Sequence, residues 1–261
     1  ENNGNGNCTK GYALALTNNP SASTVGSINL NGENTLTGGI IVKAEGAVDV
    51  TTNSADLIPA PEGYYWNEGV LTPIEITDAE ALIETTYGTT YYTTLEEAVE
   101  AATSGQTVTL LKDVEIEIEA GLLINKNLTV DLNNNKITNT CSNGEGDVFR
   151  VESVESPTTF TVKNGTLNSQ DIAIYSAGNG NDVNTVIVEN VVVNSDWFGI
   201  YHNGSKYGAN ITVRNSAITD TYEEGVGIYL SGSESWNNAK SGEKLNSLTI
   251  NNSTIKGATA V

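Results

Sequence analysis

Val162-Lys163-Asn164-Gly165-Thr166-Leu167 is the first of four stretches that follow one pattern, and the pattern decides the fold. Each copy has an aliphatic residue, a variable residue, an Asn, two small or variable residues and a second aliphatic residue. The other copies lie at 188–193, 213–218 and 250–255, and a fainter copy precedes them at 132–137. Four copies with matching apolar positions indicate an internal repeat.

The spacing of the repeat indicates short strands with no helix between them. The Asn residues at 164, 190 and 215 are 26 and 25 residues apart, and Asn252 follows 37 residues later because of a loop at 231–246. A second short apolar strand follows three copies, at 172–175, 198–201 and 226–229. Coils of this kind cannot bury their apolar side alone and must stack, so the sequence predicts an all-β solenoid, a parallel β-helix.

Stacking predicts two columns of side chains at one corner of the coil. Equivalent residues lie about 4.8 Å apart on neighbouring rungs. The repeated Asn residues should therefore form a structural ladder, in which each Asn adopts a left-handed turn and bonds to its neighbours. The ladder members are Asn134, Asn164, Asn190, Asn215 and Asn252. The preceding column is Lys163, Glu189 and Arg214, whose alternating charges favour pairing between rungs.

The chain before the repeat divides into three parts. Residues 1–58 contain short strands and are expected to form β-helix-type coils, either the end of a preceding module or a complementing segment. Residues 59–92 contain three prolines and two candidate hairpins, and form a junction. Residues 93–261 are expected to hold a cap helix, over 93–104, and the parallel β-helix. Thr94 and Glu97 have capping-box spacing, and an amphipathic helix here would cover the apolar end of the first coil.

The cap region carries a family resemblance. Tyr92-Thr93-Thr94-Leu95-Glu96-Glu97-Ala98-Val99-Glu100-Ala101-Ala102, then Gly105-Gln106-Thr107-Val108-Thr109-Leu110 and Asn127-Leu128-Thr129-Val130-Asp131-Leu132, resembles the opening of right-handed parallel β-helix domains of the pectate-lyase-like superfamily. It is most similar to modules of large bacterial surface proteins of the adhesin-like kind. The resemblance covers 79–261 and implies a secreted, cell-surface location, whereas its motifs are specific for fold and weak for activity.

Composition limits the partners. The formal net charge is −20 and the chain has only two arginines, Arg150 and Arg214, which argues against nucleic acid and anionic membranes. The two cysteines, Cys8 and Cys141, match no metal spacing, and the sequence leaves open whether they are paired. No metal site and no cofactor are expected.

The sequence favours a non-catalytic protein. A polysaccharide lyase or hydrolase needs a base or converging carboxylates, whereas Asp171, Asp182, Asp196 and Asp220 occupy different offsets in the repeat. A carbohydrate-active β-helix, whether lyase, hydrolase or glycan-binding module, is the alternative. Its candidate glycan contacts are Trp197, Tyr201, His202 and Tyr207, although such residues more often pack at a strand end.

The two ends of the sequence predict self-association. Residues 258–261 resemble the second strand of a coil, and an uncovered coil is an open strand edge. Coils at 11–45 are expected to lie against 247–261 of another copy, in a tandem array or by strand addition, or to fold back within one chain. The expected function is a rigid extracellular stalk or a head-to-tail filament.

Overall fold

The structure is a computed structural model that describes residues 12–17, 26–28, 39–43, 50–52, 64–73, 78–85, 88–141, 146–154, 156–178, 182–204, 207–232 and 246–258. The chain divides into two compact units, 1–78 and 79–261. Cys8, most of the 231–246 loop and the expected strand end at 259–261 lie outside the described residues.

The first unit has two small sheets of short strands. One sheet pairs β1 (Tyr12–Thr17) with β3 (Gly39–Lys43) in parallel. In the other, β2 (Gly26–Ile28) and β4 (Val50–Thr52) are parallel, and β4 continues to the hairpin of β5 (Tyr64–Asn67) and β6 (Val70–Pro73). Glu68 and Gly69 have φ values of 48° and 81°, as a two-residue hairpin turn requires. The hairpin expected at this place from the sequence is therefore present.

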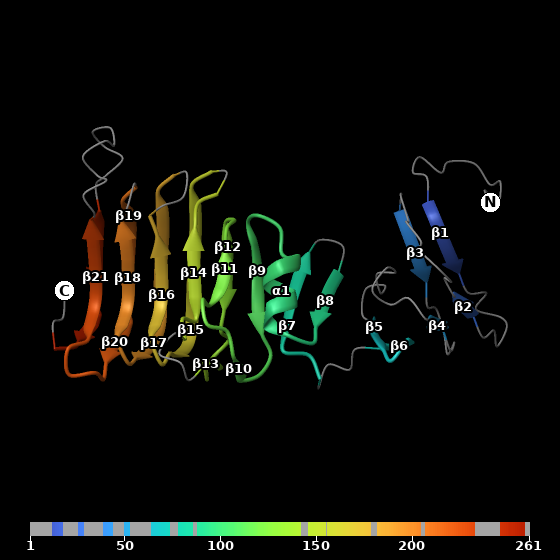
Figure 1. Ribbon diagram of the computed structural model, residues 1–261, viewed down its shortest axis with the longest axis horizontal. Helices are drawn as coiled ribbons and strands as arrows, with labels where there is room; N and C mark the ends of the chain where they lie inside the picture. Colours follow the sequence, from blue (N-terminus) through green and yellow to red (C-terminus); the bar gives the residue numbers. More distant parts are fainter. Residues whose placement is uncertain are drawn as a thin grey trace. The chain divides into compact units, whose positions relative to one another are not determined.

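The second unit is a parallel β-solenoid of about four turns. Its strands stack on three faces, and Figure 1 shows the third face in front. The first face holds β9 (Gln106–Leu110), β12 (Leu128–Asp131), the first halves of β15 (Thr158–Asn168) and β17 (Asn184–Ser195), β19 (Ala209–Arg214) and β22 (Ser247–Asn251). The second holds β10 (Val114–Ile116), β13 (Lys136–Asn139), the second halves of β15 and β17, β20 (Ala217–Asp220) and β23 (Thr254–Lys256).

The third face is a five-stranded parallel sheet. It consists of β11 (Leu122–Ile124), β14 (Phe149–Glu152), β16 (Ile172–Ala177), β18 (Phe198–Gly204) and β21 (Val226–Gly232). The last three strands contain the second apolar strands expected from the sequence. The repeat therefore predicted both the solenoid and the stretch of each of these coils that forms a separate strand.

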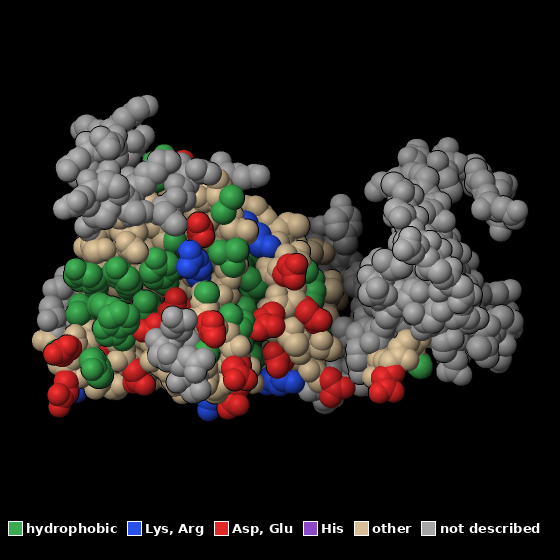
Figure 2. All heavy atoms as spheres, viewed as in Figure 1, with side chains coloured by type: hydrophobic (Ala, Val, Ile, Leu, Met, Phe, Trp, Pro, Cys, Tyr) green, Lys and Arg blue, Asp and Glu red, His purple; other side chains and the backbone are tan. Residues whose placement is uncertain are grey.

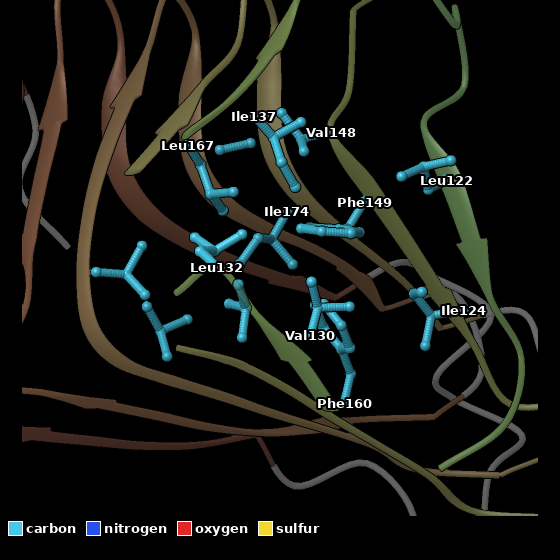
Figure 3. Packing of buried hydrophobic residues seen from close by; sticks show 14 of the residues in the cluster. Leu122, Ile124, Val130, Leu132, Ile137, Val148, Phe149, Phe160, Leu167 and Ile174 are labelled. Carbon is cyan, nitrogen blue, oxygen red and sulfur yellow. The ribbon is translucent and has the colours of Figure 1, made fainter. Parts of the chain in front are cut away.

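The interior is built from the alternation of apolar residues along each strand. Residues such as Val130, Val162 and Val188 face inward at paired positions and are fully buried. The rings of Phe149 and Phe160 meet in the centre at 4.8 Å, among the aliphatic side chains shown in Figure 3. Full burial of each such side chain contributes about 1.5–3 kcal/mol, so the stacked core supplies the main stabilisation.

The N-terminal end of the solenoid is closed by a helix and a hairpin. Helix α1 (Leu95–Ala101) buries Leu95, Ala98 and Val99, and it is shorter than the expected span of 93–104. Its N-cap is Thr94, whose side chain accepts from the Glu97 N–H, while the Glu97 carboxylate accepts from the Thr93 hydroxyl. Strands β7 (Ala81–Thr85) and β8 (Gly88–Tyr92) form the hairpin, and β7 pairs antiparallel with β9. The helix and hairpin together cover the apolar end of the solenoid and its strand edge. The sequence predicted that the helix alone would cover them.

Candidate functional site

The repeated Asn residues form a ladder at the bend between the first and second faces, which we call the asparagine corner. Asn164, Asn190, Asn215 and Asn252 have φ values of 61°, 54°, 51° and 48°, in the left-handed region that Asn tolerates better than most residues. The Nδ2 of Asn190 donates to Oδ1 of Asn164 at 3.2 Å, and Nδ2 of Asn252 donates to Oδ1 of Asn215 at 2.9 Å. Asn190, Asn215 and Asn252 are exposed and Asn164 is half-buried, so the asparagine corner organises the bend and is not a core element.

The lowest rung of this corner differs from the expected ladder. Asn133 and Asn134 both have positive φ, because the turn here is two residues longer than that at Asn164. The Nδ2 of Asn164 donates to Oδ1 of Asp131 at 3.0 Å. Asn134 lies next to Asn164, to whose carbonyl its backbone N–H donates at 2.7 Å, but the side-chain bond expected for Asn134 is made by Asp131.

The charged column follows the corner, in the expected register. Lys163 and Glu189 are register partners on neighbouring strands, as are Glu189 and Arg214. Arg214 Nη2 lies 2.8 Å from the Glu189 carboxylate and forms an ion pair with it. Lys163 Nζ lies 3.2 Å from Asp131. Partial burial raises the pKa of Asp131, but hydrogen bonds from Asn164, Asn133 and Lys163 outweigh it and hold the pKa below its ordinary value.

A second polar group lies inside the solenoid, and we call Ser153, Ser176, Asn184 and His202 the buried polar cluster. The Asn184 amide lies 3.1 Å from the Val151 carbonyl, 2.9 Å from the Ala177 carbonyl and 3.0 Å from Ser176 Oγ. Its Oδ1 accepts from Ser153 Oγ at 2.6 Å. Asn184 therefore joins three rungs through one side chain.

His202 completes the buried polar cluster as a neutral ring. Its Nδ1 lies 3.0 Å from Ser176 Oγ, and its Nε2 lies 3.1 Å from the Tyr207 carbonyl. Its Nδ1 also lies 3.1 Å from the Ser176 backbone carbonyl, so each ring nitrogen faces a carbonyl acceptor and these contacts fit either tautomer. Burial lowers the pKa of His202 below its ordinary value, although the Tyr207 and Ser176 carbonyls oppose the shift. His202 is fully buried, so it lies away from the surface that a glycan would contact.

The third face carries an aromatic stripe, which we define as Tyr175, Phe198, Tyr201 and Tyr229. Tyr175, Tyr201 and Tyr229 occupy paired positions on β16, β18 and β21. Tyr201 and Tyr229 are 5.5 Å apart with nearly parallel rings, and Phe198 stacks on both at 5.0 and 5.6 Å. Figure 2 shows hydrophobic side chains gathered over these strands, with acidic side chains around the lower margin.

The stripe has an exposed aromatic margin and a cationic end. Trp197 packs on Phe198 at 4.7 Å, and 46% of its surface is exposed, compared with 44% for Tyr229. At the other end, the Arg150 guanidinium lies over the Tyr175 ring at 5.2 Å. Of the four candidate glycan contacts, Trp197 and Tyr201 therefore belong to one surface. Tyr207 instead bonds through its backbone to His202 and Gly178.

A glycine lies within the stripe at a closely packed position. A Cβ on Gly199 would lie 2.2 Å from Ile218 Cγ2 and 2.5 Å from the Gly227 carbonyl oxygen, so only glycine fits between these rungs. Gly199 directly follows Phe198, whose ring meets Tyr201 and Tyr229. The repeated pattern of Gly199-Ile200-Tyr201 and Gly227-Ile228-Tyr229 was the sequence signal for this arrangement.

The carboxylates at the turn between the second and third faces act as turn caps. Asp220 accepts from the Tyr222 N–H at 2.9 Å and from Ser195 Oγ at 3.2 Å. Asp196 accepts from the Thr221 hydroxyl. Burial raises the pKa of Asp220, and the neighbouring charge of Asp196 adds to the rise, against the effect of these hydrogen bonds. The structure brings these two carboxylates near each other, which their unequal offsets in the sequence did not suggest.

Two further features describe the chemistry of the solenoid. Cys141 is a buried free thiol. Among the residues that the structure describes, His, Cys, Asp and Glu side chains nowhere gather in the groups of three that could hold a metal ion. Within the same residues, every helix is too short or too polar to cross a membrane.

Comparisons with protein-family models, curated proteins and solved structures find no match for this chain.

Proposed function

We propose that this protein is a non-catalytic extracellular module that acts as a rigid stalk and adhesive element, in the manner of bacterial adhesin-like surface proteins. The observation that carries the proposal is the continuous stacking of the solenoid, with side-chain ladders along its bends. Each coil advances such a rod by about 4.8 Å, so stacked modules place a tip at a distance from a surface. The resemblance of the cap motif to the opening of parallel β-helix modules in bacterial surface proteins supports this assignment.

Stiffness follows from how the coils are joined. Successive described rungs are bonded through backbone ladders on three faces as far as β21, and the last rung, β22 and β23, is bonded on two. The core side chains pack between rungs. Bending the solenoid would break hydrogen bonds on one face and compress packed side chains on another. A stalk needs this mechanical property and needs no catalytic group.

Head-to-tail association is part of the same proposal. In the last described rung, β22 pairs with β19 and β23 pairs with β20. No other described strand pairs with the opposite side of either one. A further coil, from continuing chain or from residues 11–45 of another copy, would extend the ladders. A heterologous contact of this kind propagates as a filament.

Electron microscopy and light scattering of the purified protein test this proposal. We expect rods whose length grows with protein concentration, and stalk exposure on intact cells of the source organism as measured by protease shaving. Compact, monodisperse particles at every concentration would contradict the filament. Release of reducing or unsaturated sugars from polysaccharides, abolished by Asp220→Asn or Arg214→Ala, would contradict the non-catalytic assignment.

Glycan binding is the second candidate function, and the aromatic stripe favours it. Large exposed aromatic surfaces on soluble proteins mark places of interaction, and Tyr and Trp are enriched there. This function agrees with an adhesive stalk, because the ligand would bind to the side of the rod without any chemical step.

A further inference from the structure

We propose that the aromatic stripe binds a neutral, flat, extended glycan that lies along the solenoid axis, an inference that rests on the adhesive part of the proposed function. The stripe and its Arg150 end cross four successive strands, β14, β16, β18 and β21, at paired positions. A linear ligand can therefore contact one ring per rung. The ligand class that this geometry selects is a β-1,4-linked hexose chain, whose sugar rings form a flat ribbon.

The ring geometry favours a sugar ribbon. Tyr201 and Tyr229 have ring planes only 25° apart, and Phe198 and Tyr229 only 20° apart. Tyr175 instead meets Tyr201 edge-on at 64°, so the nearly parallel part of the stripe is Phe198, Tyr201 and Tyr229. Offset rings of this kind overlap in part and leave edges and portions of each face toward solvent. The C–H face of a pyranose is apolar and packs against such rings, while its hydroxyls point sideways. A flat ribbon can repeat this contact along the stripe, whereas a helical α-linked chain turns its next sugars away.

The spacing argues against an extended peptide as the occupant. A peptide strand places side chains on one face about every 6.8 Å. The ring centroids of Tyr175 and Tyr201 are 5.6 Å apart and those of Tyr201 and Tyr229 are 5.5 Å apart, because these residues are paired on neighbouring rungs. A peptide running along the stripe would lose register within two rungs. A chain of sugar rings, each similar in width to a tyrosine ring, keeps it.

Charge argues for a neutral glycan. The protein has a net charge of −20, which repels polyuronates and sialylated chains. Arg150, the cation at the end of the stripe, lies 3.6 Å from the Glu152 carboxylate and stacks on Tyr175. Its charge is therefore already balanced within the protein, and an anionic sugar would gain little from it.

Polar groups lie beside the stripe where sugar hydroxyls would fall. Asn203 and Ser231 occupy paired positions two residues beyond Tyr201 and Tyr229 on the same strands. Asn203 Nδ2 donates to the Tyr175 hydroxyl at 3.1 Å. Ser231 Oγ donates to the His202 carbonyl at 3.0 Å, so Ser231 Oγ would act as an acceptor for a sugar hydroxyl. Amide and hydroxyl side chains next to an aromatic platform supply both donors and acceptors, so hydroxyls on one edge of the ribbon would have partners.

The test is calorimetric titration of the full chain with four hexasaccharides. Cellohexaose is the flat neutral ribbon, and maltohexaose has the same sugars in α linkage. Laminarihexaose changes only the linkage position, and hexagalacturonate carries charge. We expect binding of cellohexaose, and affinities for the other three that are lower by about tenfold or more, the size of effect produced by losing one aromatic hot spot.

Variants of the stripe and its margin separate the contribution of ring stacking from that of the Tyr229 hydroxyl. Tyr229→Ala and Trp197→Ala should each weaken cellohexaose binding about tenfold. Tyr229→Phe, which keeps the ring, should bind as the natural protein does. Tyr91→Ala, in the capping hairpin away from the stripe, is the off-site control, and urea midpoints verify that each variant is folded.

Three results would overturn the inference: no heat with cellohexaose, unchanged affinity in both alanine variants, or tightest binding of hexagalacturonate. Electron microscopy of the same samples keeps the outcomes apart. Rods that do not bind cellohexaose would contradict the glycan inference but not the stalk proposal. Compact particles that bind cellohexaose would contradict only the stalk proposal.

Discussion

The asparagine corner and the buried polar cluster are both hydrogen-bonded columns that join successive coils, yet they are built in opposite ways. The asparagine corner repeats one residue in one backbone conformation on the surface. The buried polar cluster uses two Ser residues, one Asn and one His in a site shielded from water. Repetition makes a column visible in the sequence, whereas burial makes it energetically important.

The largest effect is expected from removing the hub of the buried polar cluster. Asn184→Ala would leave Ser153, Ser176 and two backbone carbonyls without their shared partner. We expect a loss of about 3 kcal/mol in the free energy of unfolding, since unsatisfied buried polar groups cost about 1–3 kcal/mol each. Chemical denaturation measures the loss.

The structure supplies controls for this variant. The residue paired with Asn184 on the next rung is Ala209, also fully buried, so the backbone accepts alanine at this position. The exposed Asn210→Ala should change the unfolding free energy by less than about 0.5 kcal/mol. Equal losses of unfolding free energy in Asn184→Ala and Asn210→Ala would show that burial of the Asn184 amide is not the source of the loss.

Acid should weaken the buried polar cluster before it affects the asparagine corner. Since burial lowers the pKa of His202, the unfolded chain binds this proton more tightly than the folded one. Stability is therefore complete above the unfolded pKa of about 6.5 and falls as the pH drops below it, until the folded pKa is passed.

Urea midpoints between pH 7.5 and 5.5 test this dependence in a window above the ordinary titration of carboxylates. We expect the natural protein to lose stability across the window, and His202→Gln to show a flatter profile. A His202→Gln variant with the same pH slope as the natural protein would show that another group titrates.

The same contrast explains what the sequence could predict. Asn164, Asn190, Asn215 and Asn252 recur at one place in an aliphatic frame, so the solenoid, its register and the asparagine corner followed from pattern alone. The partners of His202 come from residues 5 to 26 positions away in the chain and share no residue type. Their proximity depends on coil stacking in three dimensions, which one-dimensional spacing does not contain.

The aromatic stripe lies between these two cases. Tyr175, Tyr201 and Tyr229 recur in the repeat, so a column of tyrosines could have been read from the sequence. The stacking of Phe198 on these tyrosines could not, because its paired positions on the neighbouring rungs are Ile172 and Val226, so no aromatic residue repeats there. His202, which follows Tyr201 directly, points inward because strand residues alternate between faces.

In the asparagine corner, the left-handed backbone conformation should contribute more to stability than the side-chain amide hydrogen bonds. Asn190→Ala places a residue with a poor left-handed conformation at φ 54°, so we expect a loss of about 1 kcal/mol. Asn190→Gly removes the same amide but adopts positive φ freely, and should cost less. Denaturation of the two variants measures the difference. If glycine costs as much as alanine, the amide ladder carries the stability and not the turn.

The smallest effect is expected from the charged column beside the asparagine corner. Arg214 Nη2 and the Glu189 carboxylate are 2.8 Å apart, but both side chains are partly exposed. Water and salt screen such pairs, and ordering two long side chains opposes their attraction. A double-mutant cycle of Glu189→Gln and Arg214→Gln should therefore give a coupling of about 0.2–1 kcal/mol at low salt. The coupling should shrink in about 1 M salt, where the Debye length is about 3 Å. A larger coupling that persists in salt would mean that the column behaves like the buried polar cluster, and that exposure does not set the strength of a column in this solenoid.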